Sequence, residues 1–271
     1  MNWADKINDF HYNIGANLTF VDNEVTKFKG DEASYSGTTM IKEGYGINTQ
    51  YIYIADRIVQ TQADLDYVQS LVDNPKLDEE GKPINYFKNF KRPELGDVLY
   101  KDMNNNGYLD DDDRVARGHG DTPRFLFNFN LGFEYKGFDF STVLSGTGSY
   151  KVQYTHMRSS YLTFGNQISK EVADNCWHEG MTNAKYPRLM SNGDSRNTRQ
   201  STIWETDKSY FKIRNIQLGY TLPQKWLQTL SLNRVRLFCS LENFFTFTDY
   251  AGMDPETNKL TYPTMRQASF G

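Results

Sequence analysis

The residue types and spacing best suited to chemistry lie in one acidic segment, DMNNNGYLDDDD, at residues 102–113. Side chains that carry oxygen occupy its positions 1, 3, 5, 9 and 12, Gly107 occupies position 6, and Tyr108 offers a backbone carbonyl at position 7. This is the layout of an EF-hand-type calcium loop, in which the glycine permits a sharp bend and the oxygens converge on a hard cation. The sequence therefore predicts a structural Ca²⁺ site with the ligands Asp102, Asn104, Asn106, Tyr108, Asp110 and Asp113.

Two features distinguish this segment from a full EF-hand. Asp113 is one methylene shorter than the glutamate that usually binds calcium at position 12, and no flanking helices are predicted. An acidic solvated turn without metal is the alternative, because Asn, Gly and Asp form turns on their own. Repulsion among Asp102, Asp110 and Asp113 favours the cation, since a divalent ion would relieve it.

The other polar residues form no catalytic or cofactor-binding pattern. The four histidines are scattered, Cys176 and Cys239 lack metal-type spacing, and no nucleophile elbow, phosphate loop or zinc motif occurs. A contiguous carboxylate run such as 110–113 is not an acid/base pair set across a bond. We therefore predict no catalytic residue and no enzyme. Four aromatic residues of a long polar stretch could stack on sugars or simply pack within it: Tyr161, Trp177, Tyr186 and Trp204.

The elements that must position the acidic loop are long β-strands, most clearly at residues 124–146, RFLFNFNLGFEYKGFDFSTVLSG. Aromatic and aliphatic residues alternate with polar ones on both sides of a tight turn at Lys136-Gly137, which predicts a hairpin with one apolar face. Each arm has about ten residues, the length that a strand needs to cross a bilayer. The hairpin fits a membrane β-barrel with its aromatic face toward lipid and its polar face toward a watery lumen. A soluble β-sandwich hairpin would alternate in the same way.

The same alternation recurs along the chain. Residues 10–20 repeat it after a short turn at 5–9, and residues 209–220 repeat it with a slip around 214–216 that indicates a bulge. Residues 234–248 form a further long strand with aromatics at its far end, and residues 262–271 begin another. Together with the hairpin, these segments predict about six wall strands.

The connections are of two kinds. The turns at 5–9, 136–137 and 221–233 are short and read as periplasmic, whereas 28–122 and 151–207 are long and read as extracellular loop regions. Within them we expect loops at 28–44 and 74–92 and short helices at 63–72 and near 167–175. We also expect residues 45–60 to pair with 97–101 above the membrane, and a helical turn at 223–230.

The overall composition excludes some classes of function. The formal net charge of −4 supplies no basic field for nucleic acid. No window approaches 18 consecutive apolar residues, so no transmembrane helix is expected. The first residues, MNWADKIND, contain no apolar signal-peptide core, so we expect a protein that is not exported or a piece of a longer one.

Several segments in the same order resemble the C-terminal third of the SusC/RagA family, the TonB-dependent outer-membrane importers of the Bacteroidetes. They are GDVLYKDMNNNGYLDDDDR at 96–114, PRFLFNFNLGFEYKGFDFS at 123–141, KSYFKIRNIQLGYTLP at 208–223, VRLFCSLENFFTFTDYAGMDPE at 235–256, and the final YPTMRQASFG. The resemblance implies a 22-stranded barrel with an N-terminal plug, and it implies a SusD-like surface lipoprotein as partner. It also implies uptake of oligosaccharides or peptides, powered by the TonB complex acting on the plug. The plug and most of the barrel would lie outside residues 1–271.

The sequence thus predicts an all-β fold: a portion of an antiparallel transmembrane β-barrel in the cell outer membrane, with long extracellular loops and a few short helices. The rival is a soluble, calcium-stabilised β-sandwich that binds glycans at the cell surface. Exposure distinguishes the two, because a barrel leaves the aromatic face of residues 125–133 uncovered and a sandwich buries it between sheets.

Overall fold

The computed structural model describes residues 1–29, 33–118, 122–148, 150–154, 168, 170–190, 195–228, 232–257, 262 and 264–271. The chain divides into two compact units. The first, called here the sheet unit, comprises Met1–Asp22, Thr122–Tyr150 and Asp207–Gly271. The second, called the loop unit, comprises Asn23–Asp121 and Lys151–Thr206. The two segments of the loop unit nearly coincide with the regions 28–122 and 151–207 that the sequence separates from the long strands.

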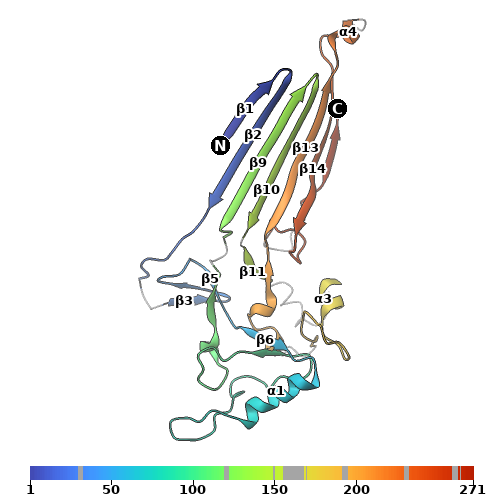
Figure 1. Ribbon diagram of the computed structural model, residues 1–271. Helices are drawn as coiled ribbons and strands as arrows, with labels where there is room; N and C mark the ends of the chain where they lie inside the picture. The colour runs from blue at the N-terminus through green and yellow to red at the C-terminus, as the bar shows by residue number, and fades with distance from the viewer. Residues whose placement is uncertain are drawn as a thin grey trace. The chain divides into compact units, whose positions relative to one another are not determined.

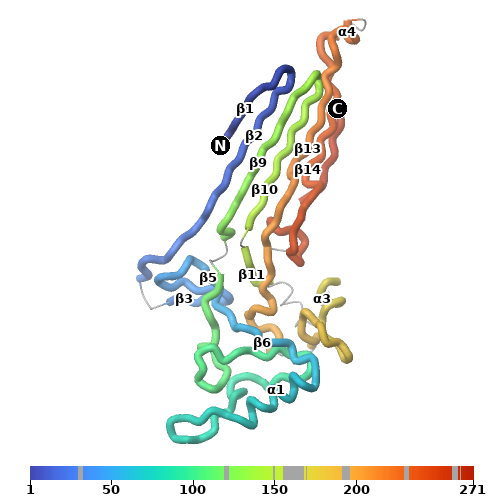
Figure 2. The backbone as a smooth tube through the Cα atoms, in the orientation of Figure 1, coloured from blue at the N-terminus to red at the C-terminus, as the bar shows by residue number. Residues whose placement is uncertain are grey.

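The sheet unit is built on one antiparallel sheet of seven strands in the order β1-β2-β9-β10-β13-β14-β15 (Figure 1). Five strands are long, with eleven to thirteen residues: β2 (Phe10–Phe20), β9 (Phe125–Tyr135), β10 (Phe138–Gly148), β13 (Tyr210–Thr221) and β14 (Arg236–Thr248). The shorter strands β1 (Asn2–Ile7) and β15 (Gln267–Phe270) form the two edges of the sheet (Figure 2).

The first strand corrects the sequence-based prediction of about six strands. Residues 5–7, expected in a turn, belong to β1, and the turn is confined to Asn8 and Asp9. The segment NWADKI has two adjacent charged residues, Asp5 and Lys6, and only two large apolar side chains, so its alternation is weak. The segment forms a strand because its backbone pairs with β2, not because its residues alternate. Backbone hydrogen bonds do not depend on side-chain type.

The registers place the apolar residues of neighbouring strands on the same face. Phe133 of β9 lies opposite Tyr12 of β2 and Phe140 of β10, and each strand continues this match at every second position. The β9–β10 turn has Lys136 and Gly137 at φ 47° and 87°, the left-handed pair that a two-residue hairpin needs. The predicted hairpin is therefore confirmed.

A bulge interrupts β13 at Arg214, as the sequence pattern indicates. Ile213 pairs with Leu144 and Asn215 with Val143, so Arg214 is an inserted residue relative to β10. One extra residue locally breaks the two-residue alternation and lets adjacent polar side chains share a face. Arg214 and Asn215 share a face in this way and bond to Ser145 and Ser240.

The loop unit contains small sheets. Strands β3 (Ala33–Ser36), β4 (Thr39–Lys42), β5 (Thr49–Ile52) and β8 (Val115–Arg117) form one. Strands β6 (Ala55–Ile58) and β7 (Val98–Tyr100) form the second, and β11 (Lys151–Gln153) and β12 (Glu205–Asp207) pair as well. The β6–β7 pairing confirms the predicted contact between 45–60 and 97–101. The prediction of a loop at 28–44 was wrong, because β3 and β4 form a hairpin there despite their Ser and Thr content.

The helices are short. Helix α1 (Gln62–Asp73) begins with a capping box in which Thr61 and Asp64 bond each other's backbone N–H, and Val68 is fully buried. Helices α3 (Lys170–Asn175) and α4 (Gln224–Leu227) lie where the sequence predicts helical turns, and 3₁₀ turns occupy Asp111–Asp113, Ser195–Asn197 and Thr202–Trp204. None of the helices that the structure describes has the length and apolarity to cross a membrane.

The buried hydrophobic core lies in the loop unit. Tyr53, Val59, Val68, Leu99 and Leu109 belong to one packed cluster that joins α1, β7 and the acidic segment. Among the buried hydrophobic side chains of the described residues, only Tyr150 and Leu227 belong to the sheet unit. The long sheet therefore holds together by backbone pairing and by contacts between side chains along its own faces.

Candidate functional site

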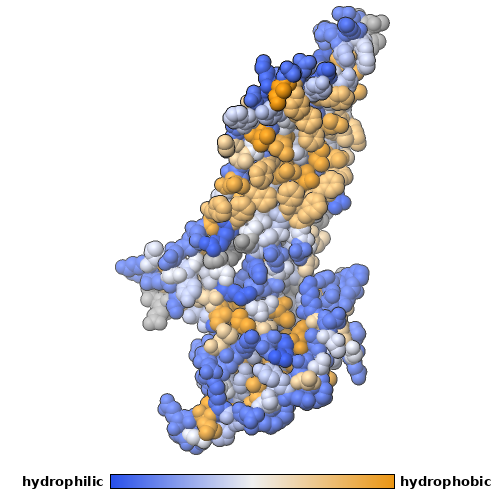
Figure 3. All heavy atoms as spheres, viewed as in Figure 1, coloured by the Kyte–Doolittle hydropathy of each residue, from blue (hydrophilic) through white to orange (hydrophobic). Residues whose placement is uncertain are grey.

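The first candidate surface is the apolar face of the seven-stranded sheet. Leu131 and Phe133 are each 36% exposed and Leu237 is 55% exposed, although all three lie on long strands of the sheet. Their neighbours Phe125, Phe127 and Phe129 are partly exposed, and none of these residues is buried. Hydrophobic side chains cover the visible face of the sheet (Figure 3).

The rings of this face pack against each other rather than under another layer. Phe133 stacks with Phe10 at 5.6 Å and with Phe140 at 5.2 Å between ring centroids, and Phe127 stacks with Phe211 at 6.1 Å. Such neighbour contacts leave the outer side of each ring uncovered. A contiguous apolar surface of this extent marks contact with a membrane or a partner. The sheet does not have the buried inner face of a sandwich.

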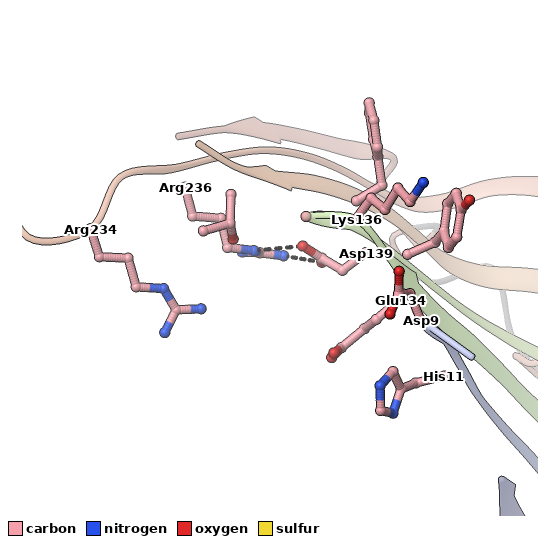
Figure 4. A pocket seen from close by; sticks show the side chains of 11 residues that line it. Asp9, His11, Glu134, Lys136, Asp139, Arg234 and Arg236 are labelled. Atoms are coloured by element: carbon pink, nitrogen blue, oxygen red, sulfur yellow. Dashed lines mark hydrogen bonds and ion pairs between the residues drawn. The ribbon is translucent and has the colours of Figure 1, made fainter. Parts of the chain in front are cut away.

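The opposite face of the sheet is polar and carries ion pairs. At the end with the short turns, Arg236 donates two hydrogen bonds to Asp139, at 2.5 and 3.0 Å, across the intervening strand β13. This pair borders a pocket of about 390 Å³ that is lined mainly by charged side chains. His11 and Glu134 project from neighbouring strands on one side of the pocket, and Arg234 stands apart on the other (Figure 4).

A second polar cluster lies near the other end of β13. Lys212, only 2% exposed, places its Nζ 2.5 Å from Oε2 of Glu256, a residue of the segment after β14. The Arg214 guanidinium also pairs with Glu256, and the Tyr210 hydroxyl donates to Glu256 Oε1 at 2.9 Å. Sequence reasoning missed this cluster, because it depends on contacts between residues more than forty positions apart.

The acidic segment 102–113 folds as a compact turn in the loop unit. Asp102 accepts hydrogen bonds from the N–H groups of Asn106 and Gly107, at 3.2 and 2.8 Å. Asn104 Oδ1 accepts from the N–H of Asn106, and the Asn106 amide donates to Asp110 Oδ2 at 3.0 Å. These bonds bring loop positions 1, 3, 5 and 9 together, as the calcium-loop pattern requires.

Asp113 behaves differently from the predicted ligand at position 12. Its carboxyl is fully buried and accepts hydrogen bonds from the N–H groups of Met103 (2.7 Å), Asn104 (3.4 Å) and Asp110 (2.9 Å). With Asp110 as N-cap, it completes the capping box of the 3₁₀ turn Asp111–Asp113. Burial is the main reason why the pKa of Asp113 is raised, although these N–H groups oppose the rise. Both oxygens of Asp113 are thus engaged with backbone, and a metal would have to share them.

Side-chain oxygens of positions 1, 3, 5 and 9 lie in one turn, and both oxygens of Asp102 and of Asp110 accept hydrogen bonds, as those of Asp113 do. Within the described residues, no group of three or more His, Cys, Asp or Glu side chains is arranged as a metal-binding cluster. The pattern here relies instead on two asparagine amides and the carbonyl of Tyr108 besides its carboxylates. Lys76 donates to the Asn105 carbonyl at 2.8 Å, so a positively charged side chain of this chain contacts the segment.

The aromatic residues weighed as sugar-stacking candidates pack inside the loop unit. Trp204 and Tyr186 are 1% and 5% exposed, and their rings stack on each other at 5.8 Å. The ring of Trp177 lies against Gly96, whose positive φ of 85° is the conformation that glycine adopts freely. Tyr161 lies outside the described residues. Trp177, Tyr186 and Trp204 therefore pack within the loop unit, which was the alternative to stacking on sugars.

No protein-family model matches the chain. TonB-dependent receptor P39 of Formosa agariphila is 27% identical over 268 residues, which cover 91% of this chain and 26% of that protein. TonB-dependent receptor SusC of Bacteroides thetaiotaomicron is 27% identical over 252 residues, which cover 92% of this chain and 22% of that protein. TonB-dependent receptor P3 of Formosa agariphila is 34% identical over 166 residues, 60% of this chain and 16% of the relative.

Solved structures show the same fold over nearly the whole chain. The RagAB peptide transporter matches with a TM-score of 0.67 at 18% identity, covering 98% of this chain and 27% of that one. The RagAB peptide importer in the open-open state matches with a TM-score of 0.65 at 20% identity, with the same coverage.

The chain thus spans between 16% and 26% of the length of these curated relatives. The sequence relationship to TonB-dependent receptors runs over most of its residues, and the fold shared with RagAB runs over nearly all of them. The chain therefore resembles part of a TonB-dependent receptor in sequence and part of RagAB in fold.

Proposed function

We propose that the seven-stranded sheet is a portion of the wall of an outer-membrane β-barrel, with its apolar face against lipid and its polar face toward the lumen. The observation that carries this proposal is the uncovered aromatic face on strands of eleven to thirteen residues. Such strands have the length needed to cross a bilayer at a tilt. Lipid would cover the apolar face, which water would not favour. The edge strands β1 and β15 would pair with further wall strands.

The whole protein, in this proposal, imports glycans or oligopeptides and works with a SusD-like lipoprotein and the TonB complex. Support comes from the relatives, one named SusC and others described as a peptide importer, RagAB. The short turns at Asn8-Asp9 and Lys136-Gly137 would face the periplasm. The loop unit, on the same reasoning, is extracellular, since barrels of this kind place their long loops outside the cell.

Site-directed spin labelling of the protein in outer-membrane vesicles tests the wall assignment. One nitroxide is placed at each position from 126 to 134 of β9, and its collision rates with oxygen and with a water-soluble nickel complex are measured. We expect oxygen accessibility to peak at Phe127, Phe129, Leu131 and Phe133, and nickel accessibility to peak at the positions between them. Two-residue periodicities in opposite phase follow from one face in lipid and one in water. Matching phases for both reagents would rule out the wall assignment.

We further propose that the acidic segment binds Ca²⁺ as a structural ion through Asp102, Asn104, Asn106, the carbonyl of Tyr108 and Asp110, with Asp113 in a capping role. The convergence of loop positions 1, 3, 5 and 9 supports this proposal. A bound cation would offset the repulsion among the carboxylates and hold the turn against β7 and β8.

Limited proteolysis of the full-length protein tests the calcium proposal. We expect calcium to slow cleavage within residues 96–118 several-fold relative to chelator, because ligand binding lowers the population of the open segment. Asp102→Asn removes one charged ligand oxygen and should abolish the difference. Asp78→Asn, in a turn outside the segment, is the matched control and should retain it. Equal cleavage rates of the unsubstituted protein in calcium and in chelator would contradict the proposal.

A further inference from the structure

The polar cluster around Glu256 has the composition of a carboxylate receptor. Lys212 Nζ lies 2.5 Å from Glu256 Oε2, and the Arg214 guanidinium meets the same carboxylate, with its Nη1 at 3.4 Å from Oε2. Tyr210 donates its hydroxyl to Oε1 at 2.9 Å. Two cations and a neutral donor thus converge on one carboxylate, and charge-assisted bonds of this kind are the strongest that side chains form.

Lys212, Arg214 and Tyr210 belong to strand β13 of the sheet, whereas Glu256 does not. Lys212 and Arg214 lie two residues apart in β13 and therefore share its polar face, where Arg214 Nε donates to Ser145 Oγ at 2.6 Å. Glu256 comes from the segment after β14, where a local turn holds it: its N–H donates to Asp254 Oδ1 at 2.9 Å. Asp254 in turn accepts from Thr264, whose N–H lies 3.2 Å from Oδ2.

One side of the cluster is buried and the other is exposed to solvent. The Lys212 side chain is 2% exposed, while those of Glu256 and Arg214 are 20% and 38% exposed. Burial tends to raise the pKa of the Glu256 carboxyl, but the bonds from Lys212, Arg214 and Tyr210 outweigh it and hold that pKa below its usual range. Glu256 therefore remains an anion, and its outer side faces solvent together with the Arg214 guanidinium.

Lys212 favours a close anion at this place. A buried ammonium is unfavourable without a close partner, and without Glu256 it would keep the longer contact with Asp254 Oδ1, at 3.7 Å. That Asp254 oxygen also accepts from the Glu256 N–H. A carboxylate that arrives from the open side would find Arg214 accessible and could exchange with Glu256 while Lys212 keeps a close anionic partner.

We propose that Lys212, Arg214 and Tyr210 form a carboxylate-binding site on the polar face of the sheet, which Glu256 fills as an internal occupant until a carboxylate of the transported ligand replaces it. This inference rests on the proposed import function, which places that face in the lumen. The shared ligand chemistry is a carboxylate, whether from an acidic sugar or from a peptide. Glu256 then acts as a built-in competitor that keeps the site closed to neutral molecules.

Chemical rescue tests the receptor. The Glu256→Ala protein in detergent should unfold at a temperature several degrees lower than the unsubstituted protein, since Lys212 loses its 2.5 Å contact and keeps the longer one with Asp254. Propionate, which resembles the missing side chain, should restore most of that shift, whereas propionamide at equal concentration should not. In Glu256→Ala/Lys212→Met, which removes the buried cation as well, propionate should have no effect. Equal effects of propionate and propionamide on Glu256→Ala would overturn the proposal.

Ligand binding tests the exchange and separates the two sources of carboxylate. Trigalacturonate and an acidic tripeptide are titrated calorimetrically into the unsubstituted and Glu256→Ala proteins, with the neutral sugar trimer and an amidated neutral tripeptide as controls. Removal of an internal competitor should tighten binding of the matching acidic ligand about tenfold or more and leave the neutral controls unchanged. Unchanged affinity for both acidic ligands would refute the exchange. Chemical rescue and calorimetric binding can both be measured without transport. A spin-label scan without the expected periodicity would therefore contradict the wall assignment and leave the result of these two assays standing.

Discussion

Phe129→Arg is expected to prevent stable assembly of the protein in the outer membrane. Phe129 lies near the middle of β9 on the apolar face, opposite Ala16 of β2 and Leu144 of β10. An arginine on the lipid face of a barrel near the bilayer midplane costs about 2–4 kcal/mol, to which loss of the ring contact with Phe127 adds. We expect the folded, heat-modifiable form to disappear from outer-membrane fractions and the urea midpoint in phospholipid vesicles to fall.

Asn130→Arg is the matched control, because it introduces the same side chain one position further along the same strand. Asn130 pairs with Gly15 and Val143 on the polar face and is exposed. In water an arginine keeps its hydration, so this variant should assemble with a change in stability of at most about 1 kcal/mol. If both variants assembled equally well, or if only Asn130→Arg failed, the lipid-facing assignment would be wrong.

Asp97→Ala should open the loop unit, because Asp97 joins the start of β7 to residues 188–197, which lie more than ninety positions away. Its fully buried carboxylate accepts hydrogen bonds from Arg188 Nε at 2.8 Å, Arg196 Nη1 at 2.9 Å and Asn197 Nδ2 at 2.9 Å. Removing one member of a buried ion network leaves the remaining charges uncompensated, at a cost of about 3–5 kcal/mol. Hydrogen–deuterium exchange should therefore accelerate in β6, β7 and residues 195–204 while the long strands remain protected.

Glu94→Ala is the control for Asp97→Ala, because Glu94 pairs with the same Arg188. Its side chain is 66% exposed and makes a 2.7 Å contact with Arg188 Nη2, so its removal should cost no more than about 1 kcal/mol. Asp97→Asn, which keeps the shape but removes the charge, should fall between the two. Similar exchange rates in the Asp97→Ala and Glu94→Ala proteins would show that Asp97 does not organise the unit.

The strands with clean alternation could be predicted from sequence because their two faces meet different surroundings along their whole length. Residues 125–135 and 138–148 carry an apolar side chain at nearly every second position, and the structure confirms both strands and the turn between them. The Arg214 bulge was visible for the same reason, since an inserted residue shifts the phase of the pattern. Residues 2–7 and 33–42 lack such a pattern, and there the pairing partner decided the conformation.

In the acidic segment, the sequence motif predicts the local turns but not the part that Asp113 plays in them. The spacing of Asp102, Asn104, Asn106 and Asp110 correctly indicated that these residues would converge, because each side chain bonds a backbone N–H only two to five positions away. Asp113 could not be placed in this way, since its burial and its bonds to Met103 and Asn104 depend on the packing of the whole loop. Calcium binding by the segment stays a prediction.

The sequence by itself determined the long strands, their two faces and the Lys136-Gly137 turn, because each depends on residues close together in the chain. Only the tertiary structure decided that the aromatic face remains uncovered, that Asp97 gathers Arg188 and Arg196, and that Glu256 fills a site formed by Lys212 and Arg214. These contacts join residues from about forty to a hundred positions apart. Their energies depend on burial and on mutual distance, which no local pattern of residue types contains.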